Sequence, residues 1–196
     1  IAAIFYDAIP VLRPDLVKDA RIRENHASYM RGLADCDLVI PISEFSEQCL
    51  RKFWDEQLVA PTSVVTTLLP AEFDGVTRQP INKQVGKKAT SILCVSTLEP
   101  RKNHIRLLDA VKALRERRPD LDFSLTLVGN RYAGGDYIAE AVESACKTDS
   151  KIKWVGVIDD EALASVYAKS DLTVYASEIE GFGMPILESV WYGKPC

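Results

Sequence analysis

The sequence is poor in the residues that hold metals or build disulfide frameworks. Only two of its 196 residues are histidines, and its five cysteines are widely spaced, with no pair in a CxxC arrangement. An odd number of isolated cysteines is typical of reduced thiols rather than of a disulfide-stapled fold or a zinc site. We therefore expect no metal, no organic cofactor and a cytoplasmic location.

Other signals are missing as well. No apolar run approaches the roughly 20 residues that span a bilayer, and no signal peptide is visible. The formal net charge is −4, from 24 Lys+Arg and 28 Asp+Glu, and this mild acidic excess gives no case for nucleic acid as a partner. GxGxxG and GxxxxGK[ST] do not occur, so NAD-type and P-loop interpretations have no motif support. The chain begins without Met and stops just after a predicted helix, so we expect a fragment of a longer protein.

The sequence does contain a regular alternation of apolar strands and amphipathic helices. The expected strands are 2–6, 37–43, 63–69, 91–96, 123–129, 152–156 and 171–177. The expected helices are 16–34, 43–54, 104–117, 137–146, 159–170 and 184–193. Such an alternation predicts an α/β fold of Rossmann-like parallel sheets with helices on both faces.

Local signals suggest where these helices begin, end and face the core. Ser43 is a candidate N-cap, acids open the helix at 159–170, and Gly193 stands where helices often terminate. Helical spacing predicts these inward positions: Leu16, Ala20, Tyr29, Leu33, Ile105, Leu108, Val111 and Leu114.

Hydrophobic periodicity is lost between residues 70 and 88, where Pro and Gly dominate. This break is the best candidate for an interdomain linker. We therefore expect residues 1–80 to form the end of one Rossmann-like domain plus the linker, and residues 81–196 to form a second, truncated one.

In parallel α/β sheets, ligands bind at the carboxyl ends of the strands, which directs attention to three loops. After the strand at 91–96, Arg101 and Lys102 stand at the start of a helix, where an anion such as a diphosphate would be favoured. The alternative is a solvated basic turn paired with Glu99. After the strand at 123–129, Gly129 allows a tight turn, and an ordinary loop is the alternative.

The third loop contains "EGFGMPILE". Gly181 and Gly183 could let the backbone lie against a ligand, and the following helix start would attract phosphates. Glu180 and Glu188 bracket this turn with seven residues between them, and their carboxylates could accept hydrogen bonds from sugar hydroxyls. The alternative is that both acids merely complement the helix dipole.

These segments together resemble one known family. "EGFGMPILE" resembles the E-x7-E signature of the retaining glycosyltransferases of family four, which have the two-domain GT-B fold. "ILCVSTLEPRKNHIRLLDAVKAL", "LTLVG" and "KWVGVIDDEALASVYAKSDLTVYAS" resemble the donor-side segments of that family in the same order. "YDAIPVLRPD" and "ADCDLVIPISEFS" resemble the late part of its acceptor-side domain, so the resemblance covers nearly the whole chain.

The resemblance implies roles for individual residues. Glu180 would contact the donor sugar and Glu188 the nucleotide ribose, while Phe182 and Gly183 would offer backbone amides. Lys102 matches the phosphate-binding lysine of the family. Many members have an arginine where this chain has Thr97, and Arg101 would supply that charge, as in a subgroup that carries "TLEPRKN". Gly181, Thr97 and Gly129 complete the set of expected donor-binding residues.

That subgroup often contains mannosyltransferases of bacterial surface polysaccharides, which implies GDP-mannose as the leading donor, with a UDP-sugar as the alternative. The acceptor would be a saccharide or a lipid-linked molecule, and transfer would retain the anomeric configuration. Basic side chains in residues 13–32 could face the inner membrane surface, although interspersed acids favour a solvated helix. As a fragment, the chain should bind nucleotide weakly and transfer little sugar.

Other functions remain open from the residues alone. A nucleotide-sugar-binding relative without transfer activity would keep the same pocket, and a sugar-nucleotide epimerase or a phosphorylase would share the fold. An epimerase needs an acid/base set and a glycogen-type phosphorylase needs a pyridoxal-phosphate lysine, and neither is evident. Paired glutamates also serve glycosidases, but that interpretation leaves the basic loop and the glycine-rich helix start unexplained.

Overall fold

The computed structural model of the chain describes residues 1–17, 19–70, 72–73, 75–81 and 89–196. These residues form two compact units. Unit 1 contains Ile1–Pro70 and Ile179–Gly183, and unit 2 contains Ala71–Glu178 and Met184–Cys196. The division from sequence falls after residue 80 instead and keeps 179–183 with the second half. Of the expected linker, residues 71, 74 and 82–88 lie outside the described residues.

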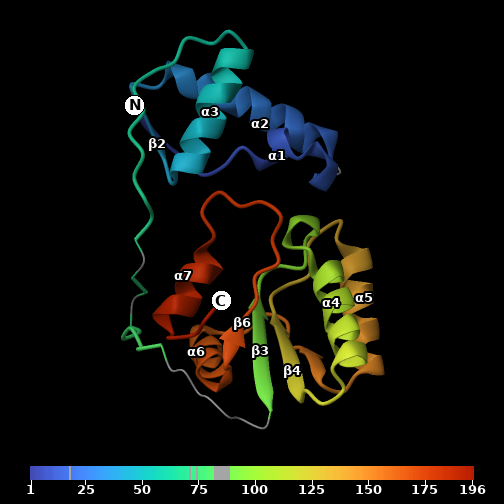
Figure 1. Cartoon of the computed structure of the whole chain (residues 1–196). Helices are drawn as coiled ribbons and strands as arrows, with labels where there is room; N and C mark the ends of the chain where they lie inside the picture. The colour runs from blue at the N-terminus through green and yellow to red at the C-terminus, as the bar shows by residue number, and fades with distance from the viewer. Residues whose placement is uncertain (18, 71, 74, 82–88) are drawn as a thin grey trace. The chain divides into compact units, whose positions relative to one another are not determined.

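Unit 1 is a small layer of two parallel strands with helices packed against it (Figure 1). Strand β1 (Ala2–Phe5) pairs in parallel with β2 (Leu38–Pro41). The helices are α1 (Ile9–Leu12), α2 (Ala20–Gly32) and α3 (Glu44–Glu56), with 3-10 turns η1 (Pro14–Leu16) and η2 (Leu33–Asp35). Its core gathers Phe5, Met30, Leu33, Leu50 and Trp54.

Two expectations for unit 1 need correction. The segment 63–69, an expected strand, runs alongside β2 with one parallel bridge, between Val64 and Val39, and three backbone hydrogen bonds from 63 to 67, but it is not a continuous strand. Helix α2 begins at Ala20 rather than Leu16, because the Asp19 side chain accepts a hydrogen bond from the Arg21 N–H at 2.9 Å and caps the helix there.

The inward face of α2 is also rotated from the expected one. Leu33 is buried as expected, but Ala20 is exposed and Tyr29 is 41% exposed, while Met30 is fully buried. The Tyr29 hydroxyl donates to the Ile4 carbonyl at 3.1 Å, so its polar end stays at the surface. The expected N-cap at Ser43 is confirmed, since its hydroxyl accepts from the Ser46 N–H at 3.0 Å.

Unit 2 has a four-stranded parallel sheet in the order β5-β4-β3-β6. Its strands are β3 (Thr90–Val95), β4 (Phe123–Val128), β5 (Ile152–Trp154) and β6 (Leu172–Thr173). Its helices are α4 (His104–Arg117), α5 (Asp136–Thr148), α6 (Asp160–Lys169) and α7 (Met184–Trp191), with a 3-10 turn η3 (Pro100–Lys102). The expectation of an α/β fold with parallel sheets is confirmed.

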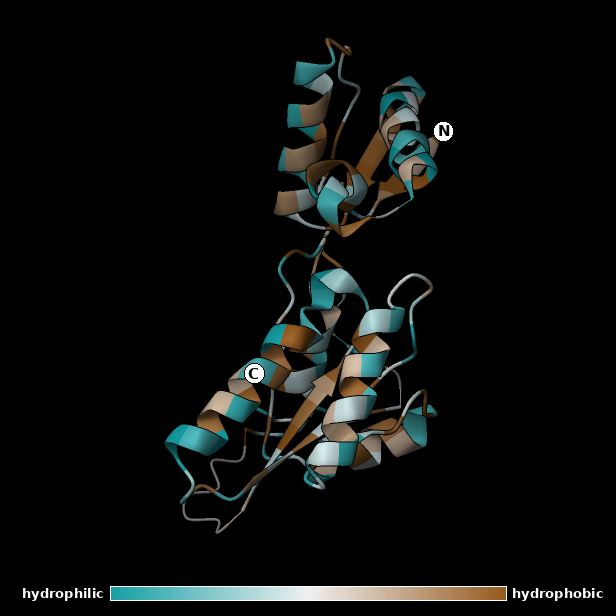
Figure 2. Cartoon of the chain, turned by 90° about the vertical axis from the view of Figure 1, so that its right-hand side faces the viewer, coloured by the Kyte–Doolittle hydropathy of each residue, from teal (hydrophilic) through white to brown (hydrophobic). Residues whose placement is uncertain are grey.

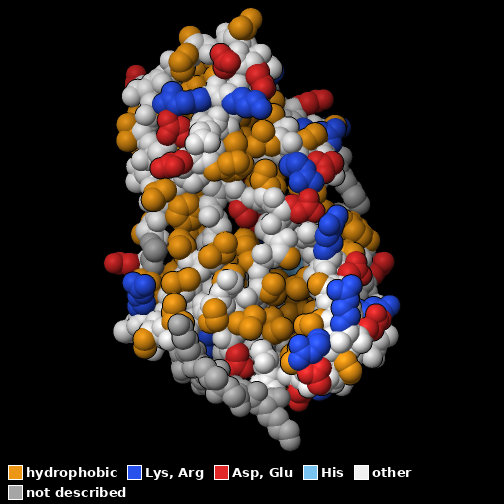
Figure 3. All heavy atoms as spheres, in the orientation of Figure 1, with side chains coloured by type: hydrophobic (Ala, Val, Ile, Leu, Met, Phe, Trp, Pro, Cys, Tyr) orange, Lys and Arg blue, Asp and Glu red, His pale blue; other side chains and the backbone are white. Residues whose placement is uncertain are grey.

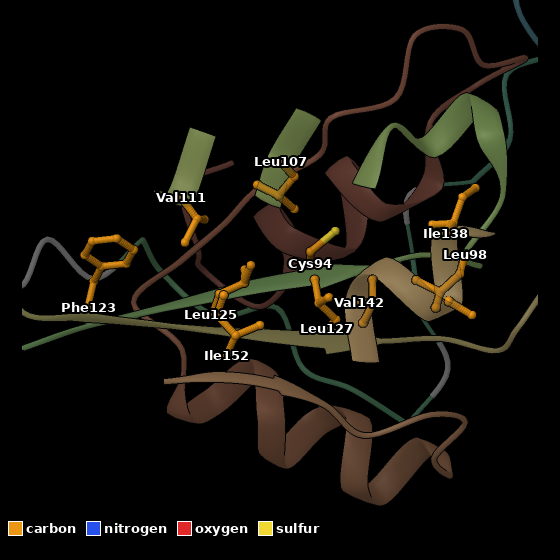
Figure 4. Packing of buried hydrophobic residues seen from close by; sticks show 11 residues of the cluster. Cys94, Leu98, Leu107, Val111, Phe123, Leu125, Leu127, Ile138, Val142 and Ile152 are labelled. Atoms are coloured by element: carbon orange, nitrogen blue, oxygen red, sulfur yellow. The ribbon is translucent and has the colours of Figure 1, made fainter. Parts of the chain in front are cut away.

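Both faces of this sheet are covered, because successive strand residues point to opposite sides. Cys94, Leu125 and Leu127 pack against Leu107 of α4 and Val142 of α5, as Figure 4 shows. Leu93 and Val128 instead pack with Tyr167 of α6. The central strand β3 therefore contributes apolar residues to both sides of the sheet, and the strands appear largely brown between mixed helices in Figure 2.

Unit 2 differs from expectation in the inward face of α4 and in the length of β6. Helix α4 buries Val111 as expected, together with His104 and Leu107. Leu108 is half-buried and packs against the core, whereas Ile105 is half-buried and Leu114 is 37% exposed. The strand expected at 171–177 is regular only at Leu172–Thr173, and the Val174 N–H still donates to the Leu93 carbonyl of β3 at 2.8 Å, so residues 175–177 continue as a loop. That early exit matters for the site described next.

The start of unit 2 packs on helix α7. The Gln79 N–H donates to the Trp191 carbonyl at 2.8 Å, and the Trp191 indole N–H donates to the Val76 carbonyl at 2.8 Å. The rings of Phe73 and Trp191 meet edge to face with centroids 5.8 Å apart. These described parts of residues 70–88 therefore belong to the second unit.

Candidate functional site

The strand order of unit 2 fixes where a ligand is expected. From β3 the chain moves outward to β4 and β5, then returns to β6 on the other side of β3. Between β3 and β6 the direction of winding reverses. Such a switch point is the usual ligand crevice of an open parallel sheet.

Lys102 occupies this switch point. It ends the η3 turn after β3, and only 8% of the residue is exposed. Its Nζ lies 2.9 Å from the hydroxyl of Tyr175, in the loop after β6, and 5.1 Å from the centroid of that ring. The phenol therefore holds a largely buried ammonium at the point where the two loops meet, a location that favours an anion.

Backbone hydrogen bonds tie the same two loops together. The carbonyl of Arg101 accepts from the Glu178 N–H at 2.8 Å and from the Ser177 hydroxyl at 3.1 Å. The guanidinium of Arg101 forms an ion pair with Glu99 at 2.7 Å. The two cations lie at the start of the helix, and Arg101 also forms the pairing with Glu99 that was the alternative. An anion bound at Arg101 would therefore share the guanidinium with the Glu99 carboxylate.

Tyr175 and Ser177 are not among the site residues expected from the sequence. Both lie in a segment that looked like the end of a regular strand. The position of Tyr175 at the carboxyl end of the expected strand could have identified it, because ligands of parallel sheets bind at that end.

His104 is a second group that the sequence left without a role in the site. It opens α4, is 1% exposed, and its Nε2 lies 3.1 Å from the Ser96 hydroxyl at the end of β3. Its Nδ1 is buried, and no hydrogen bond from the described residues reaches it. Burial, and secondarily the charge of Lys102, lower the pKa of His104 to about 4, so the ring is neutral at pH 7.

Acid is expected to destabilise the protein through His104. The unfolded chain takes up this proton near pH 6.5, whereas the folded chain takes it up only near pH 4. The contribution of neutral His104 to stability is therefore complete above pH 6.5, and it is lost as the pH falls through about 4. The loss reaches roughly 3 kcal/mol.

Urea unfolding between pH 4 and pH 7 measures this loss. His104→Gln should flatten the pH dependence, and His26→Gln, which changes the other histidine of the chain, should leave it in place. An unchanged slope in His104→Gln would show that another group causes the acid sensitivity.

Gly129 and Thr97 lie at the neighbouring carboxyl ends. Gly129 follows β4 with φ +143°, and a Cβ there would lie 2.0 Å from the Ser96 carbonyl oxygen. Its own carbonyl accepts from the Trp154 indole at 2.9 Å. The close approach of two strand ends therefore requires glycine at 129, whether or not a donor also contacts it. Thr97 is half-buried in the loop after β3.

The glycine-rich turn belongs to unit 1 for residues 179–183. Within that unit, the Gly181 carbonyl accepts from the hydroxyls of Ser43 at 2.5 Å and Ser46 at 3.3 Å. A Cβ at Gly181 would lie 2.5 Å from the Tyr6 carbonyl oxygen. Packing thus accounts for this glycine, while Gly183 adopts φ +91°. Glu180 and Phe182, both half-buried, lie in this same segment.

Glu188 belongs to unit 2, one turn into α7. Its Oε2 accepts a hydrogen bond from the Tyr167 hydroxyl of α6 at 3.0 Å. The two acids of the predicted signature are thus placed in different units, and Lys102, Arg101 and Glu188 share unit 2.

A groove of about 430 Å³ also lies in unit 2, between α4 and α5. Leu108, Lys112, Ala141 and Ala145 are among its lining residues, and no predicted site residue is. It opens on a helical face rather than at the strand ends.

The described residues contain neither a membrane-spanning helix nor a metal-binding cluster. No helix among them is long and apolar enough to cross a membrane, and no group of three or more His, Cys, Asp or Glu side chains within them could hold a metal ion. Figure 3 shows Lys and Arg side chains intermixed with Asp and Glu on the face in view, rather than gathered into a stripe of one sign.

Comparison with known proteins adds sequence relatives. The serotype-specific mannosyltransferase WbdA of Escherichia coli is 37% identical over 101 residues, which are 52% of this chain and 12% of WbdA. O-antigen chain mannosyltransferase B of Escherichia coli is 30% identical over 198 residues, covering 97% of this chain and 50% of the relative. The chain therefore spans half or less of the length of these relatives.

A solved structure, that of HepE from Anabaena, superimposes with a TM-score of 0.69 at 20% identity, covering 99% of this chain and 51% of that one. At this identity the match establishes the fold, which is that of the GT-B glycosyltransferases. The family described as glycosyl transferases group 1 matches residues 77–196. Since this match covers more than half of the chain, the chain belongs to the glycosyl transferases group 1 family.

Proposed function

We propose that the chain binds a nucleotide sugar, with GDP-mannose as the preferred donor, for transfer of the sugar to a saccharide or lipid-linked acceptor with retained configuration. The observation that carries the proposal is the largely buried ammonium of Lys102 at the switch point of the unit 2 sheet. Two relatives named as mannosyltransferases support mannose. HepE was solved with UDP and glucose, which keeps a UDP-sugar as the alternative donor.

Each site residue has a proposed task. Lys102 and Arg101 bind the diphosphate, as the start of α4 also favours. Glu188 accepts hydrogen bonds from the ribose, and Glu180 contacts the donor sugar. Phe182 and Gly183 offer backbone amides to the sugar or the phosphates, and Gly181, Thr97 and Gly129 shape the loops around them.

The proposed reaction proceeds on one face of the sugar. The acceptor hydroxyl oxygen forms a bond to the anomeric carbon as the bond from that carbon to the diphosphate oxygen breaks. The departing diphosphate takes the proton of the acceptor hydroxyl, so no protein nucleophile is needed. Lys102 and Arg101 would stabilise the charge that develops on the diphosphate, which is an electrostatic form of catalysis. The reaction is proposed to occur in the cytoplasm, with peripheral contact at the membrane when the acceptor is lipid-linked.

Calorimetric titration with GDP, UDP, ADP and GDP-mannose tests the proposal. We expect one diphosphate to bind at least tenfold more tightly than the other two, a difference of about 1.4 kcal/mol, and GDP is the expected one. Equal or absent binding of all three diphosphates would rule out a donor site built on these loops.

The variant Glu180→Ala extends this titration to the sugar. It should reduce the affinity for GDP-mannose by about tenfold, while the affinity for GDP stays within about twofold of that of the unchanged protein, because a lost hydrogen bond to a charged group costs about 1.5 kcal/mol. An equal loss on both ligands would remove Glu180 from the sugar subsite.

A further inference from the structure

The carboxylate of Glu188 is held by a tyrosine that the sequence did not point to. Tyr167 of α6 is 1% exposed, and its ring packs beneath the sheet with Leu93 and Val128. Its hydroxyl donates to Glu188 Oε2 at 3.0 Å. A hydroxyl anchored on a fully buried ring is a fixed donor, because the ring has no room to change rotamer.

A second tyrosine supports the first from the end of α7. The rings of Tyr167 and Tyr192 are stacked, with centroids 4.3 Å apart and planes inclined by 7°. The Tyr192 N–H donates to the Glu188 carbonyl at 2.9 Å, so Tyr192 lies one helical turn after Glu188 and faces the same side as that residue. The stack therefore fixes the Tyr167 ring with respect to the turn of α7 that bears the carboxylate.

The chemistry of this bond suits a ligand-binding acid. A phenol is a neutral donor, and burial together with the Glu188 charge raises the pKa of Tyr167, so the hydroxyl keeps its proton. Unlike an arginine, it does not cancel the carboxylate charge. Among the described residues, the hydrogen bond to this carboxylate comes from Tyr167 alone and uses Oε2. Oε1 is left to accept hydrogen bonds from ligand hydroxyls.

We propose that Tyr167 is the positioning residue for ribose recognition: its hydroxyl fixes Oε2 of Glu188 so that Oε1 faces the ribose hydroxyls of the bound nucleotide. This inference rests on the proposed function and adds a determinant of nucleotide affinity that does not itself touch the ligand. An acid on a helix would otherwise sample several rotamers, and fixing one of them removes that entropy cost from binding.

Packing alone would not require the hydroxyl. A buried ring stacked on Tyr192 could equally be phenylalanine, and removing a hydroxyl from an apolar core is often tolerated. Tyr167→Phe keeps the ring and the stack and deletes only the donor, so it separates positioning from packing.

The test compares a ribonucleotide with its analogue that lacks both ribose hydroxyls. We take the ratio of the affinities for GDP and 2′,3′-dideoxy-GDP as the readout, with UDP or ADP and its dideoxy form if that base binds best. Tyr167→Phe should lower this ratio by about tenfold, as expected for losing control of a hydrogen bond to a charged group, while the affinity for the dideoxy form stays unchanged. The matched control Tyr192→Phe keeps the stack and has no hydroxyl bond to Glu188 among the described contacts, so the ratio should not change.

Two further variants keep the outcome decisive. Glu188→Ala should make the affinities for GDP and its dideoxy form equal. Glu188→Asp, which shortens the side chain beyond reach of Tyr167, should lower the ratio of these affinities as Tyr167→Phe does. Suppose that Glu188→Ala makes the two affinities equal, while Tyr167→Phe and Glu188→Asp both keep the ratio of the unchanged protein. The positioning role is then wrong and the proposed function stands. If the unchanged protein binds none of the diphosphates, both proposals fail. Should Tyr167→Phe not fold, a retained ratio in Glu188→Asp still overturns the positioning role, because the shortened side chain no longer reaches Tyr167.

Discussion

Replacing Lys102 by alanine is expected to weaken the binding of the preferred nucleoside diphosphate by about 100-fold. Only 8% of the Lys102 residue is exposed, and its Nζ lies 2.9 Å from the Tyr175 hydroxyl. A phosphate that pairs with it is therefore removed from water at one side, so screening is weak and the charge-assisted bond is strong. Titration of the variant with GDP, or with whichever diphosphate binds best, gives the loss directly.

Lys112→Ala is the matched control, because it removes the same side chain from an exposed position on α4. We expect it to leave the affinity unchanged. The affinity of the unchanged protein for the diphosphate should also fall only weakly as the salt concentration rises, because salt screens a buried ion pair less than an exposed one. Wild-type affinity in Lys102→Ala would place the diphosphate elsewhere and remove the main support for the proposed site.

Substituting Gly129 with alanine is expected to lower the free energy of unfolding by roughly 4 kcal/mol. Two costs add. The residue has φ +143°, which costs a residue with a Cβ about 1–3 kcal/mol, and its Cβ would lie 2.0 Å from the Ser96 carbonyl oxygen. Since the obstacle is backbone rather than a flexible side chain, β3 and β4 must separate at their carboxyl ends. Urea unfolding measures the change.

Gly156→Ala provides the comparison. Gly156 also has positive φ, +72°, but nothing lies within 4 Å of a Cβ placed there. Only the conformational cost remains, so the loss should be about 1 kcal/mol. Equal losses in the two variants would mean that the clash at Gly129 is relieved easily and that the loop after β3 tolerates movement.

The sequence by itself determined the architecture of unit 2 and several local boundaries. Apolar strands that alternate with helices favour a parallel sheet, because each crossover helix covers one of its faces. Ser43 caps α3 as expected, acids open α6 with the Asp159 side chain accepting from the Ala162 N–H at 2.8 Å, and Gly193 ends α7 with φ +69°. These features depend on neighbours within a few residues, which the sequence shows directly.

The sequence also singled out Arg101 and Lys102, because the carboxyl-end rule needs only the order of strands and loops. It could not give their surroundings. The burial of Lys102 and the contacts of Arg101 depend on the loop that follows β6. Tyr175 of that loop is 73 residues away from Lys102 along the chain.

The tertiary structure decided which way helices face and what holds the site. Met30 rather than Tyr29 is fully buried in α2, and Leu107 is more deeply buried than Leu108 in α4. A helix rotates by a fraction of a turn to match the surface it covers, and one residue of shift is about 100°. The segment 63–69 has strand-like residues and hydrogen-bonds to β2 at alternate positions, but only one bridge forms there. The contact of Tyr167 with Glu188 joins two helices across 21 residues, and local periodicity carries no information about such a pair. Propensity and capping act over a few residues, whereas burial and side-chain contacts are set by what the whole fold brings together.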